Sequence, residues 1–249
     1  MNTNNKIINV LDLTKKFGNF TAVDKISFHV HEGEIFGFLG ANGAGKTTAM
    51  KMLTGLLSPT SGKASVAGYD VYRQSEQIKK HIGYMSQKFS LYEDLTVAEN
   101  ITFYAGIYGL SDEQIKVKTN FLLNKLGLEK SRKELIKSLP LGWKQKLAFS
   151  VAIIHDPSIV FLDEPTGGVD PITRRQFWGL IYEAADNNRT IFVTTHYMDE
   201  AEYCDRVSIM VDGRIEALDS PEMLKKNFGS KTMNDVFIQL ARRKQEQVK

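Results

Sequence analysis

One stretch of the chain constrains its fold more than any other, and it consists of Gly40-Ala41-Asn42-Gly43-Ala44-Gly45-Lys46-Thr47-Thr48. An apolar run typical of a buried strand precedes it at residues 34–39, and an apolar pattern of helical period follows at residues 46–56. Glycines allow a loop to point its N–H groups at an anion, Lys46 can neutralise phosphate charge, and the Thr47 hydroxyl can bind Mg²⁺. The stretch therefore predicts a phosphate-binding loop between a strand and a helix.

The composition is that of a globular protein. With 249 residues, of which 42% are hydrophobic, the chain can build one α/β domain or two small ones with a substantial core. Its 32 Lys and Arg against 29 Asp and Glu leave a net charge of +3, which makes no electrostatic case for a nucleic-acid partner. The single cysteine, Cys204, excludes an internal disulfide and fits a reducing cytoplasm.

We find neither a signal peptide nor an apolar run long enough to cross a bilayer. Any action at a membrane is therefore expected to depend on a partner.

Periodicity predicts an antiparallel hairpin before the loop and a helical insertion after it. Alternating patterns place the hairpin strands at residues 7–13 and 22–30. Helical patterns span residues 95–128 and include a capping box from Ser111 to Gln114. The insertion is expected at approximately residues 88–157. The remaining elements are expected as strands at 64–71, 82–85, 158–162, 190–194, 206–211 and 214–218, and helices at 143–154, 171–187 and 234–243.

Polar residues follow three of the predicted strands at the point where each strand ends. The pair Asp163-Glu164 follows the apolar run 158–162, while Gln87 and His196 come just after two other strands. Ligands bind at the carboxyl edge of open parallel sheets, where the phosphate loop is also expected. Taken alone, His196 fits a half-buried imidazole, whereas an ordinary strand-end turn is a poor explanation for an acidic pair that directly follows an apolar run.

This combination of a phosphate loop with Gln87, Asp163-Glu164 and His196 resembles the ATP-binding cassette (ABC) ATPases, from Val10 to about Leu240. The resemblance implies an α/β fold: a P-loop NTPase core with a mixed sheet, an N-terminal antiparallel β subdomain and an inserted α-helical subdomain. It also implies a single ABC ATPase domain at 1–231, with a C-terminal helix and tail at 232–249.

The resemblance also implies a role for each matching residue. Asp163 would hold Mg²⁺ with Thr47 and Gln87, while Glu164 would orient the attacking water, because one acid must stay on the metal and the other must take a proton. Gln87 and His196 would complete the catalytic set, with His196 on the γ-phosphate. The implied nucleotide-binding residues are Phe17, Gly40, Ala41, Asn42, Gly43, Ala44, Gly45, Lys46, Thr47 and Thr48. On its position alone, Phe17 fits a small core better than an adenine stack.

One motif departs from the family pattern. Members usually carry Leu-Ser-Gly-Gly-Gln at the signature, and this chain has Leu139-Pro140-Leu141-Gly142-Trp143. The family works as a head-to-tail dimer in which the signature contacts the γ-phosphate held by the opposite subunit, and the D-loop, with Gly168 and Asp170, crosses the interface. Gly142 and the start of the next helix retain part of an anion site. Two alternatives stay open: a homodimer with altered hydrolysis, or a heterodimer whose second ABC ATPase subunit supplies an intact signature.

The resemblance extends to a membrane partner. Residues 92–100 would form part of the groove that receives a membrane subunit, although they also fit a solvated helix start capped by Thr96. The residues Pro171, 194–202 and 235–238 are most similar to the exporter branch with ABC-2-type membrane subunits. This implies a Mg-dependent ATPase that powers export with ATP, at the cytoplasmic face of the cell membrane.

Two other classes of protein share parts of this pattern. A soluble ABC ATPase acting on ribosomes or DNA usually carries paired cassettes or long coiled-coil arms, which this sequence lacks. A nucleotide kinase or GTPase would keep the phosphate loop but would lack the turn at 139–146 and His196.

Overall fold

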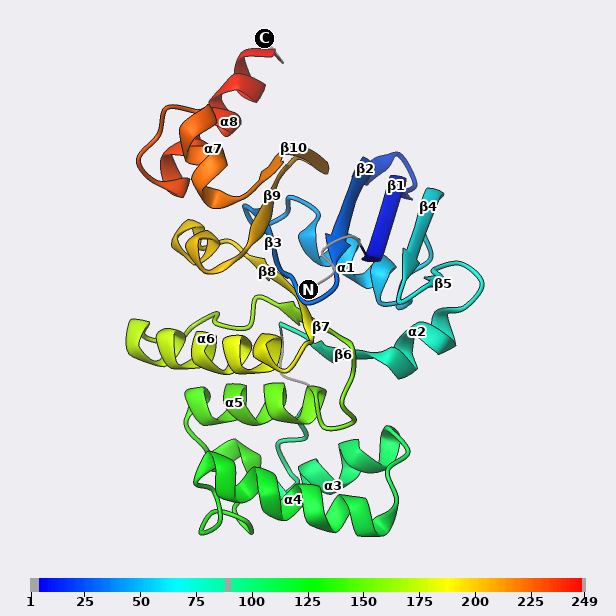
Figure 1. Ribbon diagram of the computed structural model, residues 1–249, viewed down its shortest axis with the longest axis vertical. Helices are drawn as coiled ribbons and strands as arrows, with labels where there is room; N and C mark the ends of the chain where they lie inside the picture. Colours follow the sequence, from blue (N-terminus) through cyan, green and yellow to red (C-terminus); the bar gives the residue numbers. More distant parts are fainter. Residues whose placement is uncertain (1–4, 88–90, 248–249) are drawn as a thin grey trace.

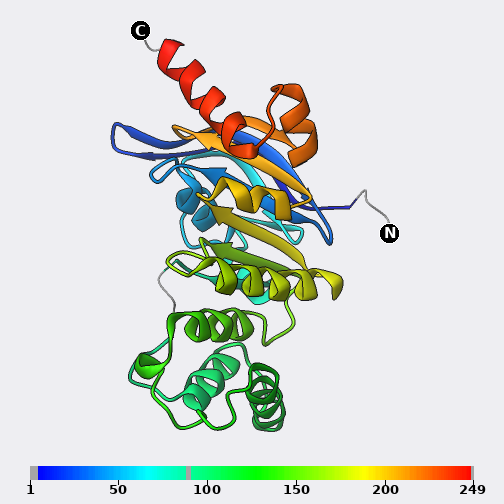
Figure 2. The ribbon, with the colours of Figure 1, turned by 90° about the vertical axis from the view of Figure 1, so that its left-hand side faces the viewer.

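A computed structural model describes residues 5–87 and 91–247 of the chain. Residues 1 and 249, the predicted outer limits of the domains, and residue 88, where the helical insertion is predicted to start, lie outside the described residues. The molecule is layered, as Figures 1 and 2 show: a helical layer at one end, a parallel-rich sheet in the middle, and an antiparallel sheet with the C-terminal helices at the other end.

The antiparallel sheet contains the predicted N-terminal hairpin. Its strand order is β2-β1-β4-β5. The first two strands pair antiparallel as far as Phe17 and Phe20, so the connecting turn is only Gly18-Asn19. The strands are β1 (Lys6–Phe17), β2 (Phe20–His31), β4 (Ser61–Val66) and β5 (Tyr69–Asp70).

The larger sheet is mixed, with strand order β10-β9-β3-β8-β7-β6. Strands β9, β3, β8, β7 and β6 are parallel, and β10 pairs antiparallel with β9 at one edge. The strands are β3 (Ile35–Gly40), β6 (Ile82–Met85), β7 (Ile159–Asp163), β8 (Thr190–Thr195), β9 (Arg206–Val211) and β10 (Arg214–Asp219). Every residue of β3, β7 and β8 is buried, because both faces of this sheet are covered.

One face of the mixed sheet packs on helix α1 (Lys46–Leu53) and the antiparallel sheet. Four phenylalanines fill the space between the two sheets, and Phe28 stacks on Phe36 with ring centroids 5.5 Å apart. Phe38 and Phe192 complete the group at 5.4 Å from each other. This aromatic layer fixes β3 against β2 and so holds the start of the phosphate loop.

Helices cover the other face. Helix α5 (Leu141–Ala152) packs on α6 (Pro171–Asp186), and α3 (Val97–Ile107) and α4 (Asp112–Leu126) lie beyond them. The predicted capping box from Ser111 to Gln114 is present, and a second one joins Thr96 to Glu99. The other helices are α2 (Ser75–His81), α7 (Pro221–Asn227), α8 (Met233–Gln247) and the 3₁₀ segments η1 (Ile136–Ser138) and η2 (Met198–Tyr203).

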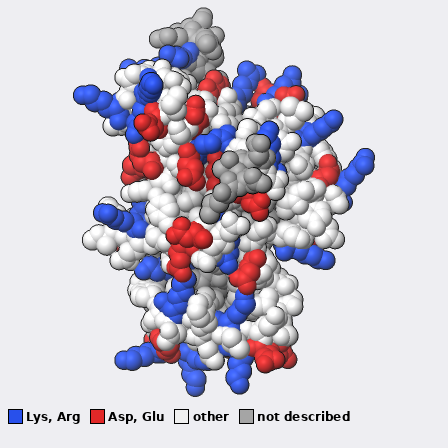
Figure 3. Space-filling view, viewed as in Figure 1, with Lys and Arg blue, Asp and Glu red and all other residues white. Residues whose placement is uncertain are grey.

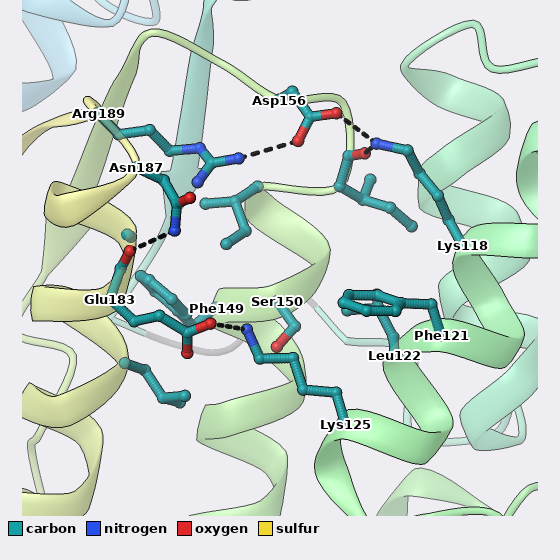
Figure 4. A pocket seen from close by; sticks show the side chains of 14 residues that line it. Lys118, Phe121, Leu122, Lys125, Phe149, Ser150, Asp156, Glu183, Asn187 and Arg189 are labelled. Carbon is teal, nitrogen blue, oxygen red and sulfur yellow. Dashed lines mark hydrogen bonds and ion pairs between the residues drawn. The ribbon is translucent and has the colours of Figure 1, made fainter.

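A cavity of about 350 Å³ lies between α4, α5 and α6, and Figure 4 shows its rim. The ion pairs Lys125–Glu183 and Lys118–Asp156, each 2.5 Å long, join α4 to the rest of the molecule across this rim. Such partly exposed pairs contribute only about 0–1 kcal/mol each. The buried apolar side chains of the floor, which include Leu122 and Phe149, therefore do more to attach the helical layer.

The surface carries mixed charge. On the face drawn in Figure 3, Lys and Arg side chains are interspersed with Asp and Glu. Within residues 5–87 and 91–247, no helix has the length and apolar content that a membrane span needs.

Candidate nucleotide site

The candidate site lies where parallel strands of the mixed sheet end. Strand β3 leads into the phosphate loop, β6 leads to Gln87, β7 ends at Asp163 and β8 leads to His196. Because parallel strands direct their carboxyl ends to one edge, residues far apart in the sequence meet there. The structure brings together four of the predicted site residues, namely Lys46, Gln87, Glu164 and His196, and sets Thr47 beside Asp163.

The phosphate loop is closed by Gly45, which precedes α1 in a left-handed conformation with φ of 104°. A Cβ atom on this residue would lie 2.4 Å from the carbonyl oxygen of Ala22, so only glycine fits. Helix α1 starts directly after it, and its first N–H groups have no partner within the helix. The helix dipole and these donors make the loop a suitable anion site.

Lys46 is buried at the centre of the loop. Its Nζ donates to the carbonyl oxygens of Gly40 at 2.9 Å and Ala41 at 3.0 Å, and it lies 3.2 Å from Oε1 of Glu164. The two side chains are only 4% and 7% exposed. A buried charge without a partner is costly, so Glu164 is the counterion of Lys46 in this structure.

Asp163 is fixed by two hydroxyl groups. Its Oδ1 accepts a hydrogen bond from Thr47 at 3.1 Å and from Thr194 at 2.6 Å. Strands β7 and β8 pair in a register that sets Thr194 opposite Asp163. The neighbouring Tyr84 stays neutral, since burial and then the charge of Asp163 raise its pKa to about 12. The sequence did not lead us to predict a role for Thr194. The one feature that could have indicated it is a hydroxyl group near the end of a buried strand.

The Glu164 carboxylate accepts hydrogen bonds from two other predicted site residues. Its Oε2 is 3.0 Å from Nε2 of Gln87 and 3.0 Å from Nδ1 of His196. Because a carboxylate only accepts, Nδ1 carries the hydrogen in this contact. The Glu164 backbone has a φ of 48°, a conformation that costs a non-glycine residue about 1–3 kcal/mol. Its N–H donates to both oxygens of Thr194, at 3.0 and 3.1 Å, which stabilises the strained turn.

These residues fit a magnesium nucleotide. Mg²⁺ is usually bound through one or two carboxylates together with substrate phosphates and waters. Thr47 and Asp163 supply the hard oxygen donors, and the described residues contain no cluster of three or more His, Cys, Asp or Glu that would bind a metal without phosphate. A cavity of about 270 Å³ over the loop is lined by Lys46, Glu164 and Gln87 among others.

Comparison with known proteins agrees with this chemistry. The sequence model of the ABC transporter family matches residues 23–167, more than half of the chain. The chain belongs to the ABC transporter family. Members of the family bind ATP with Mg²⁺ through an ATPase domain of this kind.

Individual relatives cover nearly all of this ABC ATPase domain. It is 47% identical over 239 residues to the probable multidrug ABC transporter ATP-binding protein YbhF of Escherichia coli (strain K12), a match that covers 94% of this chain and 41% of the relative. It is 41% identical over 206 residues to the phospholipid-transporting ATPase ABCA3 of Rattus norvegicus, covering 82% of this chain and 12% of that protein. The chain thus spans less than half the length of these curated relatives.

Among solved structures, an ATP-binding subunit of an ABC transporter superposes with a TM-score of 0.84 at 27% identity. The match covers 94% of this chain and 99% of that one. The predicted ABC ATPase fold class is confirmed.

The tip of the β1–β2 hairpin bears two exposed rings in this ABC ATPase. Phe20, 64% exposed, is among the described residues that line the loop cavity, whereas Phe17 is not. The Phe17 ring is 51% exposed and lies 5.1 Å from the ammonium group of Lys15. The two phenylalanines are cross-strand partners. The adenine-stacking role of Phe17 stays a prediction, and the structure adds Phe20 as a neighbouring ring.

Removing both rings, Phe17→Ala with Phe20→Ala, is expected to weaken ATP binding by about 1–3 kcal/mol, the contribution of one stacked base. Inorganic triphosphate, which has no base, should bind with unchanged affinity. The two ligands are compared by calorimetry on the same variant, and the single variants assign the loss to a ring. Phe121→Ala, at a ring that is 61% exposed on α4, is the matched control. Equal losses of affinity for ATP and for triphosphate would show that the hairpin tip affects the phosphate loop and does not contact adenine.

The predicted signature leads into α5. Pro140 is the N-cap and provides no side-chain acceptor, while its carbonyl oxygen accepts from the N–H groups of Trp143 and Lys144, so the N–H groups of Leu141 and Gly142 have no side-chain cap. A Cβ atom on Gly142 would lie 2.7 Å from Cγ2 of Thr173, so a larger residue would require Thr173 to move. Leu141 and Trp143 line a cavity of about 370 Å³ together with Gly168 and Asp170 of the predicted D-loop. None of the described residues lines both this cavity and the one over the phosphate loop.

The predicted D-loop precedes α6. Gly168 has a φ of 78°. Asp170 caps the helix by accepting from the backbone N–H groups of Ile172 and Thr173. The hydroxyl of Thr173 also donates to Asp170, at 2.6 Å, and these hydrogen bonds lower the pKa of that carboxyl group. The predicted D-loop residue Asp170 is therefore committed to a helix cap within its own chain.

Proposed function

We propose that this chain is the ATP-hydrolysing subunit of a multidrug-type exporter, and that it drives a separate ABC-2-type membrane subunit. The observation that carries this proposal is the meeting of Lys46, Glu164, Gln87 and His196 around one cavity, with Thr47 and Asp163 beside them. The name of the relative YbhF, a probable multidrug ABC transporter ATP-binding protein, supports the class of transporter.

The geometry supports a division of work between the two acids. Thr47 and Asp163 would hold Mg²⁺, which when bound neutralises charge on the phosphates of ATP. Glu164 is the base: its carboxylate accepts hydrogen bonds from Gln87 and His196, and its ion pair with Lys46 would be exchanged for phosphate when the nucleotide binds. The freed carboxylate then orients water and takes its proton.

A second subunit is needed to complete this site. The signature and the phosphate loop of one chain line separate cavities. The signature therefore does not contact a nucleotide that is bound at the loop of its own chain. A head-to-tail pair would bring each signature to the partner's loop. The uncapped N-terminus of α5 would then offer backbone N–H groups to the γ-phosphate.

Restoring the family signature tests this arrangement. The double variant Pro140→Ser/Leu141→Gly is expected to raise the ATPase rate of a homodimer roughly tenfold or more, since a hydrogen bond to a charged group contributes about 1.5–3 kcal/mol. Stability should change little for Pro140→Ser. The helix cap gains about 0.5–2 kcal/mol, while the loss of proline's constraint on the unfolded chain costs about 0.4–1 kcal/mol. An unchanged rate, together with capture of a second co-encoded ABC ATPase, would favour the heterodimer.

Exposed aromatic rings beside a small apolar cleft support docking of a membrane subunit. The cleft has a volume of only about 20 Å³, and Tyr84, Leu91, Tyr104 and Tyr108 are among the residues that line it. Beside them, the half-exposed ring of Tyr92 meets that of Phe103 edge to face at 4.8 Å. The predicted docking segment 92–100 contains both an exposed residue and a buried structural one. Tyr92 is exposed, whereas the fully buried Asn100 bonds the backbone of the preceding loop and holds its shape.

The proposed function is tested by co-expression with a candidate ABC-2-type membrane subunit. We expect the chain to sediment with membranes only when that protein is present, and the purified pair to turn over ATP in preference to GTP. Tyr92→Ala/Phe103→Ala should lose membrane sedimentation and keep ATP binding, whereas the control Val117→Ala/Phe121→Ala, at exposed apolar residues of α4, should keep both. Sedimentation with ribosomes in place of membranes would overturn the transport proposal.

A further inference from the structure

A buried carboxylate outside the phosphate loop links several parts of the site. Glu200, in η2, is fully buried, with 0% of its surface exposed. Its Oε2 accepts a hydrogen bond from Thr195 and its Oε1 accepts one from Thr166, both 2.5 Å long. A buried carboxylate is costly unless hydrogen bonds or an opposite charge compensate it. These two short hydrogen bonds therefore fix the positions of the Glu200 carboxylate and of the two threonine hydroxyls.

Both threonines adjoin residues of the proposed catalytic set. Thr195 directly precedes His196, and its hydroxyl also accepts the backbone N–H of Tyr197 at 3.0 Å. The residues on either side of His196 are thus both connected to Glu200. Thr166 lies two residues after Glu164, the residue that His196 contacts. Glu200 accordingly holds the two strand ends that carry His196 and Glu164.

The same carboxylate faces α6, which begins at the D-loop. Nε of Arg174 lies 3.6 Å from Oε1 of Glu200, which is an ion-pair distance and longer than a hydrogen bond. This Nε is buried and has no hydrogen-bond partner among the described residues. The guanidinium also lies over the ring of Tyr197, 3.9 Å from its centroid. A small displacement of α6 toward η2 would convert the ion pair into a hydrogen bond.

We propose that Glu200 is a positioning residue that holds His196 on Glu164 and, through Arg174, couples His196 to the D-loop helix. This inference rests on the roles proposed above for Glu164 and His196. Contact of a second subunit with the D-loop shifts α6, and the shift reaches His196 through Arg174, Glu200 and Thr195. The arrangement gives a physical route by which assembly of the dimer adjusts the catalytic histidine.

The first test is spectroscopic and needs no nucleotide. In the nucleotide-free protein, nitrogen-15 NMR of the imidazoles reports whether Nδ1 of His196 donates to Glu164. We expect Thr195→Val, which removes the hydroxyl and keeps the shape, to shift these signals, and Thr195→Ser to restore them. Thr54→Val removes another buried hydroxyl, at the C-cap of α1, and serves as the control for general destabilisation. Unchanged His196 signals in folded Thr195→Val would overturn the proposal.

The second test separates positioning from binding. In the assembled dimer, Glu200→Gln is expected to lower kcat about 10- to 100-fold, as expected for a catalytic group displaced by about 1 Å, while the KM for ATP stays within about twofold. Glu202→Gln, at a partly exposed residue of the same segment that pairs with Lys225, should leave both constants unchanged. A rise in KM with unchanged kcat would assign Glu200 to binding and overturn the positioning role.

A double-mutant cycle of Arg174→Met with Glu200→Gln tests the link to α6. If Glu200→Gln fails to fold, Thr195→Val takes its place in the cycle. The effects of substitutions that break the same link do not add, so Arg174→Met should lower kcat on its own but lower it little further in the variant that already carries the other substitution. Full additivity would overturn the coupling. His196→Ala with undiminished hydrolysis would instead contradict the proposed function, so the two failures are distinguishable.

Discussion

Replacing Lys46 by alanine is expected to weaken ATP binding by a factor of tens to thousands. Lys46 is the one cation among the described residues that line the loop cavity, and its ammonium group is buried beside the loop carbonyl oxygens. Truncating one member of a buried, hydrogen-bonded charge pair costs about 2–5 kcal/mol, which is roughly 30- to 5,000-fold in affinity. Equilibrium binding of a labelled ATP analogue measures the loss.

The matched control is Lys51→Ala, because Lys51 lies on the same helix and its side chain is exposed. It should bind ATP normally. Lys46→Ala also leaves Glu164 buried without its counterion, so the variant is expected to lose stability as well. The double variant Lys46→Ala/Glu164→Gln should recover stability and still bind ATP as weakly as the single variant. Unchanged ATP affinity of the single variant would exclude the loop as the phosphate site.

Replacing Glu164 by glutamine is expected to stop turnover while Mg-ATP still binds. General-base catalysis contributes about 10²- to 10⁴-fold, and glutamine cannot take the proton. Because Glu164 pairs with Lys46 at 3.2 Å, neutralising the carboxylate removes a competitor of phosphate for the lysine. ATP affinity should therefore be equal or higher, and a nucleotide-bound dimer should accumulate. Phosphate release and size-exclusion chromatography measure the two effects.

A comparison with Asp163→Asn separates the roles of the neighbouring acids. Asp163 bonds to Thr47 and Thr194 and is proposed as the metal ligand, so its variant should lose the Mg²⁺ dependence of ATP binding. Glu164→Gln should keep that dependence. Undiminished hydrolysis by Glu164→Gln would move the base to another residue.

Local patterns in the sequence were sufficient for the elements that carry the site. The predicted strand at 82–85 matches β6 (Ile82–Met85), and the predicted helix after Asp170 matches α6. The loop from Gly40 to Thr48 follows β3 and opens α1 as expected. These features depend on residues within a few positions of each other, where periodicity, helix caps and glycine conformation act.

The phosphate loop depends on both local sequence and tertiary structure. Its glycines, lysine and threonine determined by themselves that the chain can bind phosphate, because a single turn of backbone and one helix start are enough for an anion site. Only the tertiary structure decided what surrounds it. Glu164 faces Lys46 across 118 positions of sequence, and Thr194 meets Asp163 because β7 and β8 pair in one register.

The same holds for Glu200, which connects Thr166 and Thr195 below the site, and for Phe20, which lines the cavity although the family resemblance pointed to Phe17. Such contacts are set by which strands lie side by side and by how the buried faces pack. A local pattern does not encode that register, so the residues that could bind ATP were evident from the sequence, and the network that positions them was not.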